Sequence, residues 1–426
     1  MSGNFQSMND RQECLSCRYN TLNMLNKLRE TEDKDFFHTY KRLPVVIERG
    51  EGCYLYTDKG EKILDMFGGL AVNVLGYNHP LINKAIEEQV KKYIHISNFF
   101  YQEKQIQLAE KILELSGFEK VFFSNSGTEA CEAAIKVVRK FFPGTEKKVL
   151  ISFTDSFHGR TMGALSLTAR KKYRDQFKPL LPDVKHLRFN SVEELENNIN
   201  ANTAGVFLEC IQGEGGVNIV TNEFVKKINE LKNKYGFLVI ADEIQSGVGR
   251  TGKLHGFEHY GLEPDVIILA KGIGGGLPLG AILGNKRVKD VFDYGEHGST
   301  FGGNPVAAAC GLVIFNELQN GLMNRVDELG KYLYDKLIVL KNKFPDVIKE
   351  VRGMGLMLGV ELADSPSPSG RGLGGWGSSV VDLMLKENVL VNCTNQNVLR
   401  LLPPYVINES DIDLFAEKFE KVLSTL

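Results

Sequence analysis

The sequence has almost no net charge, because its 51 Lys and Arg residues are balanced by 53 Asp and Glu residues. A net charge of −2 gives no electrostatic footprint for nucleic acid or an acidic membrane surface. Long apolar runs are also missing: the longest, "VAAACGLVIF" at 306–315, is about half of the ~20 residues that a membrane span needs. The N-terminus lacks the apolar stretch of a secretory signal. We therefore expect a soluble, cytoplasmic protein that binds neither nucleic acid nor membrane.

Cysteine is scarce, with seven residues in 426. An odd number of scattered cysteines in a long chain is typical of reduced thiols in the cytosol. Cys14 and Cys17 form a CxxC pair, but no second pair or nearby histidine completes a zinc site. His255 and His259 have the spacing of a helical metal pair, yet Gly256 interrupts it and no glutamate follows the first histidine. We expect no metal.

The serine-hydrolase signature G-x-S-x-G is absent as well. Glycine, in contrast, is abundant: its 43 residues make up about 10% of the chain, against a usual ~7%. The glycines gather in stretches such as "GEGG", "GGG" and "GSTFGGN". Loops of this kind let the backbone approach a ligand closely.

Short apolar runs alternate with helix-length segments between about residues 119 and 285. The runs are "KVFF", "VLISF", "AGVFLEC", "FLVIADE" and "DVIILAK". Nearly continuous apolar strands separated by helices predict an α/β domain, with a mainly parallel sheet covered by helices on both faces. After residue 315, long helical patterns and the segments "GLMLGVEL" and "NVLRLLPP" predict a smaller α+β domain.

These patterns divide the chain into three parts. We predict an N-terminal extension at 1–35, a large domain at 76–315, and a small domain built from 36–75 and 316–426. The segment 364–379 is rich in Ser, Pro and Gly and is expected to form a flexible surface loop, in which Trp376 is a partly exposed anchor.

Ligands of parallel sheets bind outside the carboxyl ends of the strands, so the polar residues that follow the predicted strands are the first candidates for a site. These residues are Ser124 to Thr128, Ser156 to Arg160, Glu209 to Glu214, Asp242 to Gln245, and Lys271.

Ser126, Gly127 and Thr128 stand between a predicted strand and an amphipathic helix. Small residues at a helix start form an anion site from free backbone N–H groups and hydroxyls. The alternative is an ordinary helix cap. The loop is neither a G-x-G-x-x-G nor a P-loop, which argues against a dinucleotide or a nucleoside triphosphate.

Asp242 and Lys271 each end a core strand, where a charge without a partner is costly. One interpretation is a structural ion pair between them. The other gives each residue one atom of a cofactor: a pyridine nitrogen held protonated by Asp242, and an aldehyde bonded to Lys271.

The segment "DSFHGRT" offers Phe157, which can lie over a planar ring, and Arg160, which can bind a carboxylate through two hydrogen bonds. By themselves these residues are more simply a core phenylalanine and a surface arginine. His158 has no evident partner ligand and is interpreted as structural.

Seven motifs together resemble one family. They are "SNSGTEA", "SFHGRT", "IQGEGG", "ADEIQSGVGRTGKL", "LAKGIGGGLPLGA", "HGSTFGGNP" and "VLRLLPP". In this order and at these separations the chain resembles, from about residue 36 to its end, the class III, ornithine-type aminotransferases of pyridoxal-phosphate fold type I. The stretch "GGLAVNVLGYNHP" at 68–80 is most similar to the acetylornithine branch of that family.

The resemblance implies a pyridoxal 5′-phosphate cofactor bonded to Lys271. Asp242 would face its pyridine nitrogen, Gln245 its ring O3′, and Phe157 would stack on the ring.

The cofactor's phosphate would be bound by Ser126, Gly127 and Thr128. Thr300 would reach the phosphate of the neighbouring subunit's cofactor, which implies a homodimer with shared active sites.

On the substrate side, the resemblance implies that Arg160 holds the distal carboxylate and Arg400 the α-carboxylate of 2-oxoglutarate. Glu214 would pair with Arg400 when no carboxylate is bound, and Ser299 would lie close to the substrate. Lys271, with a depressed pKa, would act as the general base of a ping-pong reaction.

The expected activity is transfer of the terminal amino group of N-acetylornithine to 2-oxoglutarate, in arginine biosynthesis. Ornithine, succinylornithine, 4-aminobutyrate or a carrier-bound lysine precursor are alternative donors on the same scaffold. A semialdehyde aminomutase and a non-catalytic binding protein are more distant alternatives.

Overall fold

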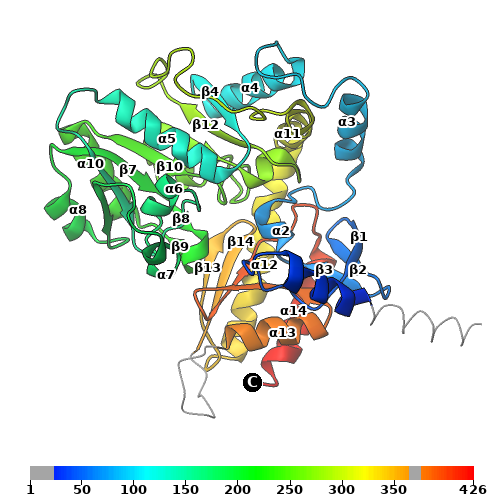
Figure 1. Cartoon of the computed structure of the whole chain (residues 1–426). Helices are drawn as coiled ribbons and strands as arrows, with labels where there is room; N and C mark the ends of the chain where they lie inside the picture. Colours follow the sequence, from blue (N-terminus) through cyan, green and yellow to red (C-terminus); the bar gives the residue numbers. More distant parts are fainter. Residues whose placement is uncertain (1–23, 364–375) are drawn as a thin grey trace, which may run out of the picture.

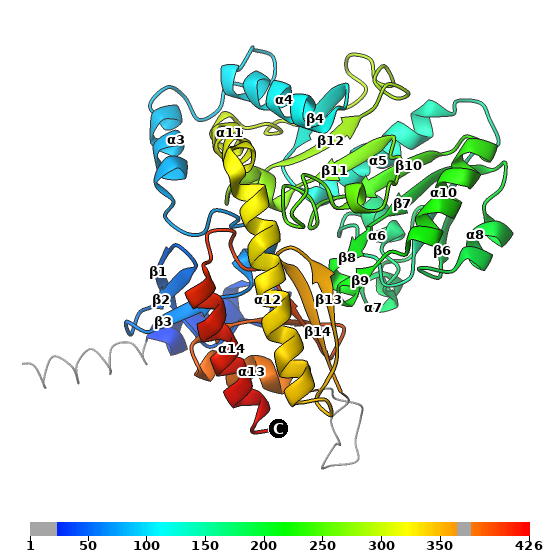
Figure 2. The same cartoon turned by 180° about the vertical axis from the view of Figure 1, so that it is seen from behind.

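The computed structural model describes residues 24–363 and 376–426. The chain forms a large body around one wide sheet and a second body in which the N-terminal and C-terminal segments lie side by side (Figures 1 and 2).

The wide sheet has seven strands in the order β4-β12-β11-β10-β7-β5-β6. Their bounds are β4 Lys120–Ser124, β5 Val149–Phe153, β6 Val184–Leu187, β7 Thr203–Leu208, β10 Leu238–Asp242, β11 Val266–Leu269 and β12 Gly280–Gly284. Every strand runs in the same direction except β12, which is antiparallel to both of its neighbours. The predicted α/β fold with a mainly parallel sheet is confirmed. Strand β12 was not predicted, because it lies within the glycine-rich stretch after Lys271.

Helices cover both faces of this sheet, which explains why its strands are almost continuously apolar. One face packs against α5 (Gly127–Phe141), whose alanines and valines contact residues such as Ile240 and Ile268. The other face packs against α10 (Asn222–Tyr235). Phe224 of this helix lies in a cluster with Val239 and with other strand residues that alternate along the chain with those of the first cluster. Successive side chains of a strand point to opposite faces, so both sets are buried.

Further short elements connect the strands of the large body or lie beside them. They are α2 Gly68–Ala71, α3 Pro80–Val90, α4 Glu103–Ser116, α6 Met162–Leu167, α7 Lys171–Arg174, α8 Val192–Asn198, β8 Ile211–Gln212, α9 Gly213–Gly216 and β9 Asn218–Ile219.

A long helical stretch links the two bodies (Figure 2). It consists of α11 (Pro305–Glu317), a kinked segment at Leu318–Leu322, and α12 (Met323–Lys343). By length and composition the stretch is apolar enough to cross a membrane, but half of its most apolar window is buried inside the protein. A core helix passes the same test, so within the described ranges this is weak evidence for a membrane span.

The second body contains two four-stranded sheets, with the orders β1-β2-β3-β15 and β13-β14-β17-β16. The strands are β1 Ile47–Glu51, β2 Tyr54–Thr57, β3 Lys62–Asp65, β13 Ile348–Met354, β14 Met357–Leu362, β15 Val389–Leu390, β16 Asn392–Thr394 and β17 Val398–Leu401. Strand β15 pairs in parallel with β3 and so joins the two ends of the chain in one sheet. Helices α13 (Gly377–Lys386) and α14 (Glu409–Leu423) pack beside α12 and these sheets.

Two sequence expectations fall partly outside the described residues, namely the extension at 1–35 and the loop at 364–379. Residues 24–35 are helical, and residues 377–379 already belong to α13. Trp376 lies at the start of that helix and is partly buried against the core. The predicted loop is therefore shorter at its C-terminal end than expected.

Candidate active site

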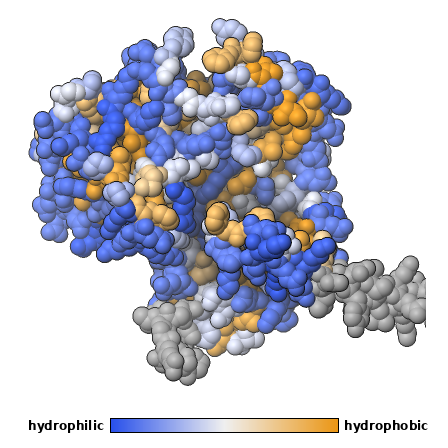
Figure 3. Space-filling view, viewed as in Figure 1, coloured by the Kyte–Doolittle hydropathy of each residue, from blue (hydrophilic) through white to orange (hydrophobic). Residues whose placement is uncertain are grey.

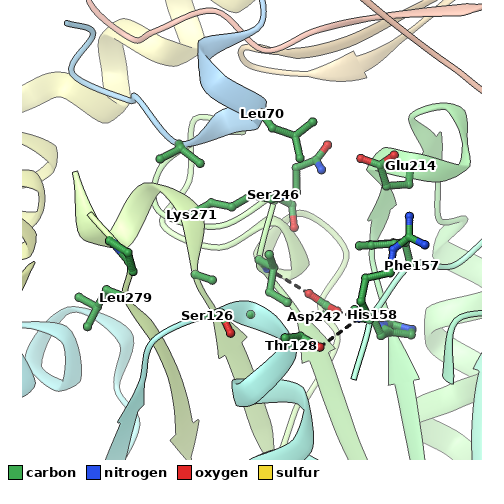
Figure 4. A pocket seen from close by; sticks show the side chains of 18 of the residues that line it. Leu70, Ser126, Thr128, Phe157, His158, Glu214, Asp242, Ser246, Lys271 and Leu279 are labelled. Carbon is green, nitrogen blue, oxygen red and sulfur yellow. Dashed lines mark hydrogen bonds and ion pairs between the residues drawn. The ribbon is translucent and has the colours of Figure 1, made fainter. Parts of the chain in front are cut away.

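A cavity of about 440 Å³ lies at the carboxyl ends of β4, β5, β7, β10 and β11. All the predicted site residues line it except Ser299, Thr300 and Arg400. Leu70 and Val72, which come from the N-terminal part of the chain, form an opposing wall. Figure 4 shows Lys271 and Phe157 on opposite sides of the cavity, Ser126 and Thr128 at one end, and Glu214 and Leu70 at the other.

The start of α5 forms one end of the cavity. Ser126 is the N-cap residue, and its hydroxyl accepts a hydrogen bond from the backbone N–H of Glu129. The N–H groups of Gly127 and Thr128 belong to the first turn, which has no acceptor within the helix. The hydroxyl of Thr128 also accepts a hydrogen bond of 3.1 Å from the N–H of Arg160. The helix cap and the anion site are therefore compatible, since the cap leaves two donors at the cavity.

Asp242 ends β10 and is only 4% exposed. One of its oxygens lies 2.7 Å from Nδ1 of His158, and the other accepts a hydrogen bond of 3.1 Å from the N–H of Ile244. Burial alone would lower the pKa of His158, but the hydrogen bond and the charge of Asp242 raise it above its ordinary value. The contact with Asp242 therefore favours the protonated form of the imidazole. The structural role expected for His158 thus includes a direct contact with a site residue, and no sequence pattern predicts this contact.

Lys271 follows β11 on the opposite side of the cavity and is half-buried. Its backbone has φ +51°, a left-handed conformation that is uncommon for a residue with a side chain. Burial lowers the pKa of its amine to about 8; the charge of Glu214 opposes this shift and that of Arg400 adds to it. Across the described ranges no ion pair joins Lys271 to Asp242, so the structural ion pair considered above does not form.

Arg400 lies in β17 behind the cavity wall and is only 1% exposed. It forms an ion pair with Glu214, which does line the cavity. The guanidinium also donates to the side-chain oxygens of Gln245, at 3.1 Å, and Asn392, at 2.8 Å. Burial raises the pKa of Glu214, but the larger combined effect of Arg400 lowers it below its ordinary value. The Glu214 carboxylate is therefore charged and screens Arg400 from the cavity.

Glu209 is a cavity residue that sequence reasoning placed among the strand ends but gave no role. Its carboxylate accepts a hydrogen bond of 3.0 Å from the backbone N–H of Phe157. Burial raises the pKa of Glu209 to about 8, opposed by the nearby His158 and assisted by the negative charge of Asp242. The contact fixes the backbone of Phe157 beside the cavity.

Ser299 and Thr300 lie in a separate surface hollow of this chain, together with Asn98 and Phe99. The Ser299 hydroxyl accepts a hydrogen bond of 3.1 Å from the side chain of Asn125, and Asn125 lines the cavity. Thr300 is exposed. In this chain, therefore, Ser299 is one side chain removed from the cavity and Thr300 points elsewhere.

Residues 24–363 and 376–426 contain no group of three or more His, Cys, Asp or Glu side chains that could hold a metal ion. The five described cysteines, at positions 53, 131, 210, 310 and 393, are free thiols. Cys14 and Cys17 lie outside the described residues.

The chain belongs to the class III aminotransferases: the family model described as "Aminotransferase class-III" matches residues 36–423. It is 43% identical to the acetylornithine aminotransferase of Caldanaerobacter subterraneus subsp. tengcongensis over 401 residues, which is 93% of this chain and 98% of that protein. It is also 40% identical to the acetylornithine aminotransferase of Methanocaldococcus jannaschii, with the same coverage of 93% and 98%.

Solved structures agree. The acetylornithine aminotransferase from Elizabethkingia anophelis superposes with a TM-score of 0.83 at 33% identity, covering 94% of this chain and 99% of that one. The ornithine aminotransferase from Toxoplasma gondii superposes with a TM-score of 0.88 at 28% identity, covering 100% and 99%. The protein is therefore a transaminase of fold type I that depends on pyridoxal phosphate, as predicted.

The residues that line the cavity suit this cofactor independently of the similarity to known aminotransferases. The first turn of α5 offers N–H donors for a phosphate. Asp242, paired with His158, offers a side-chain oxygen as an acceptor for a protonated ring nitrogen. Lys271 offers an amine on the facing side, and a cavity of about 440 Å³ has room for a compact ring between them.

Proposed function

We propose that the protein transfers the terminal amino group of N-acetylornithine to 2-oxoglutarate and gives N-acetylglutamate 5-semialdehyde and glutamate, as a step of arginine biosynthesis. The observation that carries this proposal is a pair of arginines: Arg160 lines the cavity, and Arg400 lies behind its wall, covered by Glu214. The names of the similar acetylornithine aminotransferases support the choice of donor.

Two arginines in different states suit two substrates with different charges. The donor carries one carboxylate far from its reacting amine, and Arg160 binds it. 2-Oxoglutarate carries a second carboxylate next to its reacting carbon, and Arg400 binds that one once Glu214 turns away. Glu214 prevents an unpaired buried charge at Arg400 while the donor is bound.

The cofactor supplies a reactive aldehyde and an electron-accepting ring. We assign its binding to the residues already named by the resemblance: Ser126, Gly127 and Thr128 for the phosphate, Asp242 for the ring nitrogen, Gln245 for the ring hydroxyl, Phe157 for the ring face and Lys271 for the aldehyde. Because Arg400 occupies the carbonyl oxygen of Gln245, the amide NH₂ of that side chain is available to donate.

Lys271 holds and moves the proton of the reaction. With a pKa of about 8, roughly one amine in ten is unprotonated at pH 7, far more than at the ordinary value. A free amine would accept the proton from the substrate carbon and deliver it to C4′ of the bound cofactor. The two half-reactions use one cavity in turn, so the kinetics are ping-pong.

We also propose a homodimer in which Thr300 serves the neighbouring subunit's site. The support is an exposed apolar surface beside Thr300, where Ile94 is 61%, Phe99 95%, Tyr101 96% and Phe301 58% exposed. Figure 3 shows apolar atoms gathered on the corresponding part of the surface, at the upper right. Exposed patches of this kind mark protein interfaces. Sedimentation is expected to give twice the chain mass of 47.6 kDa, and Phe99→Asp to shift the protein towards monomer.

The division into a large domain at 76–315 and a small domain at 36–75 plus 316–426 remains a proposal, supported by the pairing of β15 with β3. A cytoplasmic location is likewise proposed, supported by the free thiols of the described cysteines.

A donor panel with 2-oxoglutarate tests the proposed activity. We expect the highest kcat/KM with N-acetylornithine and identify the products by mass spectrometry. If the kcat/KM with N-acetylornithine is far below that with ornithine, succinylornithine or 4-aminobutyrate, the donor is reassigned. The panel is needed because a binding pocket discriminates between such similar substrates by only about 1 to 3 kcal/mol. Turnover without any keto acid would instead support an aminomutase.

A further inference from the structure

The guanidinium of Arg160 has an unusual environment for a charged group at a cavity. Arg160 lines the cavity and is exposed. Its backbone N–H is bound to Thr128, but throughout 24–363 and 376–426 no carboxylate lies within ion-pair distance of its side chain. Its charged group instead lies over two aromatic rings.

The closer of the two rings belongs to Tyr173 in α7. The central carbon of the guanidinium is 3.9 Å from the centroid of the Tyr173 ring and 5.5 Å from that of Phe157. The two rings meet edge to face, with centroids 6.1 Å apart. A planar cation stacked on a ring keeps its N–H donors free at the edge, while its orientation is fixed by the contact.

Helix α7 is itself anchored on two sides. Arg170 at its start donates to the backbone carbonyl of Glu214, and Arg174 at its end lies 2.9 Å from Nδ1 of His186 in β6. The ring of Tyr173 is therefore held in place by elements packed on the sheet. It is also linked, through Arg170, to the segment that carries the ion-pair partner of Arg400.

We propose that Tyr173 is a positioning residue for the donor's carboxylate: its ring holds the Arg160 guanidinium in one orientation at the cavity, with its N–H donors free to bind that carboxylate. This inference rests on the function proposed for Arg160. A free arginine side chain has many rotamers, and a site that has already fixed them binds a carboxylate more tightly. Tyr173 does not line the cavity, so it acts on the donor's carboxylate through Arg160, while its edge-to-face contact with Phe157 would affect both amines of the test below alike.

The test compares two amines that differ only in the carboxylate, N-acetylornithine and N-acetylputrescine. Each is mixed with the wild-type holoenzyme without a keto acid, and the first half-reaction is followed by the visible absorbance of the cofactor. For Tyr173→Leu we expect the second-order rate constant of the half-reaction with N-acetylornithine to fall roughly three- to thirty-fold, which is the range of a stacked cation, mostly because a higher donor concentration is needed for half saturation. The rate with N-acetylputrescine should stay unchanged. Tyr173→Phe keeps the ring and should restore the wild-type preference.

A binding measurement gives a readout independent of turnover. 2-Acetamidopentanoate is the donor without its terminal amine, so it binds but cannot react. Calorimetry is expected to give a dissociation constant that rises by the same factor in Tyr173→Leu and not in Tyr173→Phe. Tyr235→Leu removes a ring that pairs with Lys234 at 4.8 Å, away from the cavity, and is the matched control. If Tyr173→Leu does not fold, Tyr173→Met fills a similar volume without an aromatic face.

The outcomes separate this inference from the proposed function. A wild type that uses both amines equally well overturns the role of Arg160, and with it both proposals. A wild type that prefers N-acetylornithine, a preference lost in Arg160→Met but kept in Tyr173→Leu, overturns only the role of Tyr173. Equal losses with both amines in Tyr173→Leu also overturn it, because they indicate a general structural role.

Discussion

Nδ1 of His158 lies 2.7 Å from a carboxylate oxygen of Asp242, and both side chains are almost completely buried, at 0% and 3% exposed. The pair places a charged imidazole behind the carboxylate that faces the proposed ring nitrogen. Its chemical consequence is that the pKa of His158 lies above its ordinary value even though the ring is desolvated.

Replacement of His158 by phenylalanine is expected to destabilise the cofactor-free protein by about 3 kcal/mol, the usual cost of leaving one buried partner unpaired. The pKa of His158 is raised in the folded state, so its stabilisation is fully present below the ordinary value of about 6.5. It is lost as the pH rises through the higher folded value. Urea titration should therefore show a larger difference between wild type and variant at pH 6 than at pH 9.

His255 provides the control for that experiment. It is equally buried, but burial lowers its pKa to about 3. The folded state then resists protonation below about 6.5, and the wild type loses stability there. His255→Phe should accordingly show the opposite trend with pH. A His158 effect that is the same at pH 6 and pH 9 would contradict a charged imidazole.

The amine of Lys271 is expected to titrate near pH 8 in the cofactor-free protein, because burial lowers its pKa to about 8. Competitive labelling with acetic anhydride, read out by mass spectrometry of the peptides, measures the unprotonated fraction of each lysine. Labelling of Lys271 should rise to half its maximum near pH 8. The pKa of the exposed Lys331 is raised by its hydrogen bond to Asp327. Labelling of Lys331 should therefore reach half its maximum only at a pH above the ordinary lysine pKa of about 10.4. Parallel titration of the two lysines would be incompatible with a desolvated site.

Much of this site could be predicted because parallel strands bring their carboxyl ends to one edge of a sheet. The apolar runs before Asp242 and Lys271 are read directly from the sequence, and their ends converge as β10 and β11 pair. The polar residues after β4, β5 and β7 line the same cavity for the same reason.

What could not be predicted depends on contacts between side chains far apart in the chain. His158 and Asp242 are 84 positions apart, and nothing in either segment specifies which ring nitrogen meets which oxygen. The stacking of Arg160 on Tyr173 depends on how α7 packs against the sheet, and that helix is only four residues long. Short elements carry too little periodicity to be placed from sequence.

Removal of the charge at Glu214 is expected to change which amino group the enzyme prefers. In Glu214→Gln, Arg400 loses its anionic partner but keeps its contacts to Gln245 and Asn392, so it remains oriented and ready for a carboxylate. Glutamate and other amino acids carry an α-carboxylate beside the reacting amine. Their kcat/KM should rise roughly tenfold relative to that of N-acetylornithine, which corresponds to about 1.4 kcal/mol. The first half-reaction, followed for each donor by the visible absorbance of the cofactor without a keto acid, gives a second-order rate constant equal to kcat/KM and so measures the ratio. A ratio that does not move would argue against a screening role for Glu214.

Gly280, at the start of β12, is expected to be essential for the shape of the phosphate end of the cavity. A Cβ at this position would collide with the backbone carbonyl of Ser126 and lie 2.6 Å from the hydroxyl of Ser124. The backbone cannot yield as a flexible side chain would, so Gly280→Ala must displace the N-cap of α5. Since overpacking costs about 1 to 3 kcal/mol, we expect roughly tenfold weaker binding of pyridoxal phosphate in an absorbance titration. Gly284→Ala, at the far end of the same strand, would meet chiefly a methyl group of Val288 at 3.0 Å and should bind the cofactor normally. Equal affinities for both variants would show that the start of α5 does not bind the phosphate.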